Sequence, residues 1–142
     1  MSSSPAILWP VFALAAWTFC MLLLVAARRV LAGVGGRVHP REFALGESAK
    51  VPAEVSLPNR NYMNLLELPV LFYVICIVAY VTNVATDRLV PLAWSYLALR
   101  VVHSLVHVTY NRIMHRFAAF AASNFVLISM WLLVGLALAG RA

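Results

Sequence analysis

Four long apolar runs constrain the fold of this chain more than any other feature. They cover Ala6–Ala27, Tyr62–Val81, Val90–Tyr110 and Phe117–Ala139. Each is close to the roughly 20 residues that a helix needs to cross a membrane. The first and fourth runs lack the polar stripe that every helix of a soluble bundle carries. Charged residues make up only 11% of the chain, against about 25% in typical soluble domains. The sequence therefore predicts an all-α integral membrane protein, with residues 1–142 forming one domain of four antiparallel transmembrane helices.

The basic residues gather between the apolar runs and predict the orientation of the protein. The loop expected at 28–61 holds six of them, two more precede the fourth run, and the second connection holds one basic and one acidic residue. Positive charge marks cytoplasmic loops, so the first and third connections are expected in the cytoplasm and both termini on the other side. We expect a multi-pass protein of the cell (inner) membrane, with lipid around it and no nucleic-acid partner.

A polar stripe enters the second run where a membrane helix should be apolar. Arg60, Asn64 and Glu67 are spaced at i, i+4 and i+7, which places them on one helix face. Glu67 would lie roughly 10 Å inside the membrane at 1.5 Å per residue. An ionisable group at that depth is costly and indicates a functional site. Pro69, two residues on, is expected to kink or loosen the helix.

The third run carries a second stripe at the same depth. Tyr96, Arg100, His103, His107 and Tyr110 follow spacings of four, three, four and three, so one face is expected to present all five. We predict that Glu67 and Arg100 approach each other, within a subunit or across a subunit boundary. Such a pair can simply fix the register of the helices, or it can belong to a binding site, and the spacing leaves both open.

Cations and hydrogen-bond donors outnumber carboxylates on the cytoplasmic side. That surplus suits a small anionic ligand whose carboxylates guanidinium groups can grip. Arg112 and Arg116 also fit plain topology signals. The residues expected to gather there are Arg60, Asn64, Arg100, His107, Tyr110, Arg112 and Arg116.

Two other polar groups in the helices have simpler interpretations. His103 and His107, with Glu67, have a spacing that could bind a metal, but no other histidine lies in an apolar run, so we expect no metal site. Ser123 and Asn124 in the fourth run are typical of hydrogen bonds that hold membrane helices together.

The two stripes together resemble a known family. The pattern Arg60-x-x-x-Asn64-x-x-Glu67-x-Pro69 is similar to the signature of the membrane-associated proteins in eicosanoid and glutathione metabolism, the family of the microsomal glutathione transferases. The segment from Arg100 through His103 and His107, followed by Arg116-Phe-Ala-Ala-Phe120, resembles the second signature of that family.

The resemblance implies a homotrimer that binds glutathione as co-substrate at its subunit interfaces, together with a lipophilic small molecule. By position, Arg60, Asn64, Glu67 and Arg100 resemble the glutathione-binding residues. His107 and Tyr110 are expected beside them, and Arg116 resembles the catalytic arginine that stabilises the glutathione thiolate.

The chain departs from the family pattern at His107, where many members carry a tyrosine. The resemblance implies a glutathione transferase or peroxidase acting on lipophilic electrophiles. A non-catalytic protein of the same fold, binding lipophilic ligands or acting as a scaffold, is the alternative, since fold alone does not decide function. A channel or proton-linked transporter has less support, because four helices without repeat symmetry are unlike the usual transporter folds.

Overall fold

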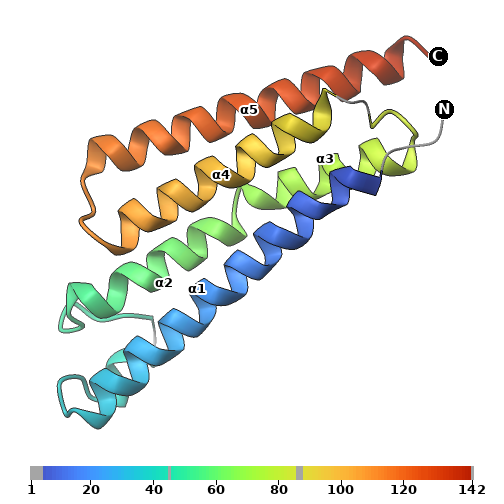
Figure 1. Ribbon diagram of the computed structural model, residues 1–142. Coiled ribbons are helices and arrows are strands. Elements are labelled where there is room, and N and C mark those ends of the chain that lie inside the picture. The colour runs from blue at the N-terminus through green and yellow to red at the C-terminus, as the bar shows by residue number, and fades with distance from the viewer. Residues whose placement is uncertain (1–4, 45, 86–87, 142) are drawn as a thin grey trace.

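The computed structural model describes residues 5–44, 46–85 and 88–141, and helices dominate it (Figure 1). Two short 3-10 turns accompany five α-helices. In chain order the elements are η1 Pro5–Ile7, α1 Leu8–Val34, η2 Pro40–Phe43, α2 Ala53–Leu66, α3 Pro69–Val81, α4 Leu89–Val108 and α5 Ile113–Ala139.

These helices supply four segments that are long and apolar enough to cross a membrane, because α2 and α3 together form one of them. The start of α1 and the end of α5 lie at the same end of the bundle as the end of α3 and the start of α4, whereas the α1–α2 loop and the α4–α5 turn lie at the opposite end (Figure 1). Arg141 ties the C-terminal end to the α3–α4 turn by donating to the carbonyls of Thr82 and Asn83 at 2.7 and 2.8 Å. The prediction of a four-span, all-α membrane bundle is therefore confirmed.

The cytoplasmic loop expected at 28–61 is wrong at both ends. Helix α1 continues to Val34, and α2 begins at Ala53, with Pro58 inside α2. The extra turns persist because they bury a small separate core, and because Arg29 of α1 pairs with Glu47 of the loop at 3.0 Å. That core consists of Ala32, Val38, Val51 and Val55, with Phe43 packed against it.

The second span is broken immediately before Pro69. Helix α2 ends at Leu66, the backbone turns at Glu67 with φ −85° and ψ −100°, and Pro69 is the first residue of α3. A proline cannot donate the helical hydrogen bond, and its ring collides with the carbonyl four residues back. At the first position of a new helix neither problem arises. The expected loosening at Pro69 thus takes the form of a complete break.

The main core lies where the four spans meet, nearer the end that carries the termini. Phe72 of α3 stacks on Tyr96 of α4 with 4.5 Å between ring centroids, and both side chains are fully buried. Leu14 of α1 and Met130 of α5 close the same cluster. Towards the other end α2 packs against α1 and α4, and polar residues replace this apolar core.

Large apolar side chains also cover the outside of the bundle. Phe19, Val81, Phe125 and Leu136 each expose more than three-fifths of their surface, and they come from all parts of the molecule. In water such a surface would drive aggregation. Acyl chains or neighbouring subunits cover surfaces of this kind in membrane proteins.

Candidate functional site

A cavity of about 400 Å³ opens between α2, α4 and α5, at the end that carries the α4–α5 turn. Its volume falls within the range of roughly 300–1,000 Å³ that holds small ligands in proteins. Most of the side chains that line it are polar or charged, and the rest are apolar. They are Arg60, Asn64 and Glu67 from the second span, His103 and His107 from α4, and Ile113, Arg116, Phe117 and Phe120 from α5.

The second span contributes its whole polar stripe to this cavity. Arg60 and Asn64 lie one turn apart on α2, and Glu67 follows at the break before α3. Arg60 and Glu67 are exposed and Asn64 is half-buried. The stripe therefore offers a cation, an amide and a carboxylate along one wall, as the spacing predicts.

Arg100 lies behind this wall and holds it in place. Its Nη2 donates to the backbone carbonyl of Asn64 at 2.8 Å and to the Oδ1 of the same residue at 2.6 Å. The guanidinium is fully buried, and its Nε and Nη1 atoms have no hydrogen-bond partner. Hydrogen bonds from a charged donor are the stronger kind, so Arg100 fixes both the backbone and the side chain of Asn64 just before the helix break.

The expected approach of Glu67 to Arg100 does not become an ion pair within the chain. Between residues that the structure describes, the ion pairs are those of Arg29, Arg37 and Lys50, at or near the α1–α2 loop. Asn64 takes the guanidinium because it lies one turn deeper into α2, where α2 packs on α4. Glu67 sits at the break and lines the cavity.

Helix α4 brings two histidines to the opposite wall. His103 and His107 are buried, lie 5.7 Å apart between ring centroids, and each has an Nδ1 atom without a partner. His103 also meets the edge of Phe120 on α5. Imidazoles without fixed partners can donate to or accept from a bound ligand.

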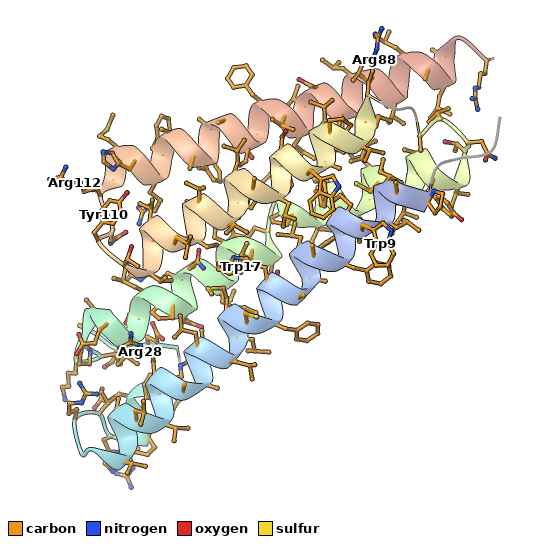
Figure 2. All side chains as sticks on the ribbon, viewed as in Figure 1. Trp9, Trp17, Arg28, Arg88, Tyr110 and Arg112 are labelled. Carbon is orange, nitrogen blue, oxygen red and sulfur yellow. The ribbon has the colours of Figure 1, made fainter. Side chains whose placement is uncertain are left out.

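Arg116 closes the cavity from the α5 side. It lies inside the first turn of α5, not in the preceding connection, because α5 begins at Ile113. Its Nη1 donates to Oδ1 of Asn111 at 2.8 Å, which orients the guanidinium. Arg112 is fully outside this lining, and Figure 2 shows its side chain pointing away from the bundle.

Tyr110 and Arg112 are the predicted residues that lie away from the cavity, whereas Arg100 lies behind its wall. Helix α4 ends at Val108, so Tyr110 leaves the face that carries His103 and His107, and the predicted five-residue stripe is wrong at this end. Its side chain is 57% exposed and its hydroxyl lies 3.1 Å from Nδ1 of His115 (Figure 2). The chain turns here because Asn111 adopts a left-handed conformation with φ 45°.

Four lining residues were not among the predicted site residues. His103 of the predicted stripe also lines the cavity. Ile113, Phe117 and Phe120 lie on the same face of α5 as Arg116. The sequence does not distinguish this face, because α5 is apolar on all sides.

The residues of the cavity can bind an anion but are poorly suited to a metal. Two arginines line it against one carboxylate, and no group of three or more metal-binding side chains occurs among the described residues. Arginine pairs with carboxylates in a bidentate way, so the site matches a small, mainly anionic ligand that also carries one positive group for Glu67.

Comparisons with known proteins agree with this geometry. A family model described as "MAPEG family" matches residues 7–136, which include part or all of each span and every residue of the cavity. Comparisons with curated proteins and with solved structures found no match.

Proposed function

The chain belongs to the MAPEG family, and we propose that it is a membrane glutathione transferase or peroxidase that activates the glutathione thiolate for attack on lipophilic electrophiles. Membership makes it a membrane protein of the family concerned with glutathione and eicosanoid metabolism. The observation that carries the finer proposal is the cavity itself, where Arg60 and Glu67 from the second span and Arg116 from α5 line a space of about 400 Å³.

The charges of glutathione complement this cavity. The tripeptide carries two carboxylates and one ammonium group. Arg60 is placed to take a carboxylate in bidentate fashion, and Glu67 to take the ammonium. Asn64, oriented by Arg100, supplies an amide for the peptide backbone. Arg100 thus acts through Asn64 as a positioning residue.

Arg116 is the residue proposed to activate the sulfur. A fixed guanidinium beside a thiol favours the charged thiolate and lowers the thiol pKa. The thiol proton leaves to water or to a neutral imidazole, for which His103 and His107 of the lining are the candidates. The thiolate then forms a carbon–sulfur bond with the electrophile, whose leaving group departs with its electron pair. With a peroxide the same sulfur attacks oxygen, and a second glutathione completes the reduction.

The position of the cavity suits a reaction between a polar and an apolar substrate. It lies at the end of the bundle that carries the basic connections, which is the cytoplasmic end by the positive-inside rule. Glutathione would enter from the water, and the lipophile along the membrane. In the homotrimer that we propose, a neighbouring subunit would close the cavity's open side.

Turnover and thiolate formation test the proposal together. Purified protein with glutathione and an aryl halide should conjugate the two. Arg116→Ala should reduce the ultraviolet difference absorbance of the thiolate and the turnover by about 10²-fold or more, the usual effect of losing one charge-stabilising group. Arg112→Ala is the matched control, because it removes a neighbouring arginine outside the cavity. Equal effects of the two substitutions would refute the role of Arg116.

A second candidate is a non-catalytic protein of the same fold that binds lipophilic ligands. It is favoured by His107 in place of the tyrosine found in many members, and by a second, apolar cavity of about 420 Å³ beside the first. It predicts lipophile binding that glutathione does not change and no turnover with any electrophile. Mutating Arg100 would then alter subunit stability without a reaction to lose.

A further inference from the structure

A cavity of about 440 Å³ lies between the α1–α2 loop and the start of α2, and we call it the loop cavity. Arg60 lines both this space and the first cavity, so the two adjoin at its side chain. The proposed reaction uses none of the other residues around the loop cavity. Those residues are Glu47, Ser48, Ala49 and Val51 of the loop and Ala53, Ser56 and Leu57 of α2.

Contacts within the loop hold its wall of the cavity in a fixed shape. Glu47 pairs with Arg29 of α1 at 3.0 Å. The Ser48 hydroxyl donates to the carboxylate of Glu42, and Val51 packs into the small separate core. A ligand that enters a space already formed pays little free energy for ordering it.

Positive charge prevails in the loop cavity. Glu47 is the one carboxylate among its described lining residues and is paired with Arg29, whereas none of the ion pairs between described residues involves Arg60. The start of α2 adds partial positive charge, because the first N–H groups of a helix lack partners within it. No side-chain hydrogen bond caps this end, and Glu54 of the first turn pairs with Arg37 outside the lining. The cavity therefore favours an anion.

Ser56 independently indicates that a ligand binds here. Ser56 is only 9% exposed, and it lies one turn before Arg60 on the face of α2 that lines the cavity. No hydrogen bond joins its hydroxyl to a described residue. The carbonyl of Pro52, four residues back, already accepts from the N–H groups of Val55 and Ser56, which fills its two lone pairs. The oxygen is not enclosed by protein, so the hydroxyl can donate to a molecule in the cavity.

We propose that the loop cavity binds a phosphate group, and that a bound phosphate competes with glutathione for Arg60. A hydroxyl, a helix start and a guanidinium together suit an anion with several acceptor oxygens. Either a soluble phosphate ester or a phospholipid headgroup carries such a group. The competition rests on the proposed function, whereas the phosphate site does not.

The competition follows from the geometry of arginine. A guanidinium grips one phosphate or carboxylate in bidentate fashion. When Arg60 turns to a phosphate in the loop cavity, glutathione loses a charge-assisted contact in the first cavity. Phosphate thus regulates glutathione binding through the one lining residue that the two cavities share.

Calorimetric titration of inorganic phosphate into the full-length protein tests the site without glutathione. The protein is held in nanodiscs of phosphatidylcholine, and chloride keeps the ionic strength constant. Ser56→Ala and Arg60→Gln should each weaken phosphate binding by about tenfold, the effect of one hydrogen bond that involves a charged group. The matched controls are Ser129→Ala and Arg41→Gln, which change residues outside the cavity and should leave the affinity unchanged.

Two further arms extend this titration. Ala53→Glu places a carboxylate at the exposed start of α2, where the helix tolerates it, and should abolish phosphate binding even if Ser56→Ala does not fold. Nanodiscs that contain phosphatidic acid distinguish the two sources of phosphate. If they block the titration, a lipid headgroup occupies the cavity; if they do not, the ligand is a soluble phosphate ester.

A titration of glutathione with and without saturating phosphate tests the competition. Phosphate should weaken glutathione binding by about tenfold, and Ser56→Ala, which binds glutathione normally, should largely lose this effect. No heat with inorganic phosphate, or equal affinity in the wild type, Ser56→Ala and Arg60→Gln, would overturn the site. Glutathione affinity that phosphate does not change would overturn the competition. A protein that binds phosphate but not glutathione would refute the proposed function and the competition, yet keep the phosphate site.

Discussion

The hydrogen bonds between Arg100 and Asn64 predict a non-additive pair of substitutions. Asn64→Leu removes the side-chain acceptor at 2.6 Å but leaves the backbone acceptor at 2.8 Å. The guanidinium, already short of partners at Nε and Nη1, then has one fewer. Hydrogen bonds to charged groups contribute about 1.5–3 kcal/mol. We therefore expect Asn64→Leu to lower the free energy of unfolding by about 2 kcal/mol.

The double variant should be less damaging than the two single variants suggest. Arg100→Met removes the buried charge, so the loss of its partner no longer leaves an unpaired donor. Couplings between polar groups in membrane helices average about 0.6 kcal/mol and reach about 1.7 kcal/mol. We expect the coupling energy of a charged, fully buried donor to lie at the upper end of this range. The coupling energy of Asn64→Leu with Arg100→Met should be about 1.5 kcal/mol, roughly a tenfold change in the unfolding equilibrium.

The two cysteines provide the assay. Cys76 is fully buried in the core, whereas Cys20 is exposed. In a Cys20→Ser background, a thiol-reactive dye therefore reports only molecules in which the core has opened. Unfolding curves in increasing denaturant give the free energies of the four proteins in the cycle. If the changes in unfolding free energy of the two single variants add up to that of the double variant within about 0.5 kcal/mol, the sites are independent. That result would contradict the conclusion that Arg100 holds Asn64 in place.

Three further predictions concern the loop, the helix break and the core. The Ser48 hydroxyl and the nearby Lys50 lower the pKa of Glu42 below its usual 4.5. The ionised carboxylate therefore stabilises the folded loop above pH 4.5. This stabilisation is lost as the pH falls through the lower pKa that Glu42 has in the folded protein. Proteolysis of the loop should therefore increase in acid below about pH 4.5, and Ser48→Ala should weaken that pH dependence. Pro69→Ala should lower the thermal midpoint slightly, because proline is preorganised for the first helical position that it occupies, and should lower turnover by about ten- to a hundredfold as the cavity wall shifts; unchanged turnover would contradict this. Leu14→Ala, at a fully buried site, should lower the free energy of unfolding by about 2–5 kcal/mol, whereas Leu136→Ala on the outer surface should change it by less than about 1 kcal/mol.

The four spans could be predicted from the sequence because the interior of a membrane permits few backbone structures. Backbone groups within a membrane must be satisfied by the helix itself, so about 20 apolar residues in a row already imply a spanning helix. The stripe of Arg60, Asn64 and Glu67 was found for the same reason. Polar side chains in such a run turn inward, and helical spacing decides which of them share a wall.

The helix ends could not be predicted, because they depend on contacts outside the membrane. Helix α1 passes Arg28 and α2 begins before Pro58 since Ala32, Val51 and Val55 pack together. No hydropathy signal marks those short apolar contacts. Likewise, nothing in the spacing of α4 indicates that it ends at Val108 and releases Tyr110 from the site.

The hydrogen-bond partner of Arg100 could not be predicted from the sequence either. Charge favoured Glu67, and depth counted along a continuous helix placed the two together. The break before Pro69 displaces Glu67 towards the cavity and leaves Asn64 as the nearest acceptor. A pairing that depends on how a broken helix resumes cannot be read from residue spacing.

Calorimetric titration of glutathione into the folded, purified protein tests the central claim most directly. The claim is that the cavity between Arg60, Glu67 and Arg116 binds an anionic thiol peptide. Glutathione should bind, and its dimethyl ester, which lacks both carboxylate charges, should bind at least about tenfold more weakly because the charge-assisted bonds to arginine are lost. No binding of glutathione by protein that is demonstrably folded, or equal affinity for the ester, would contradict the account.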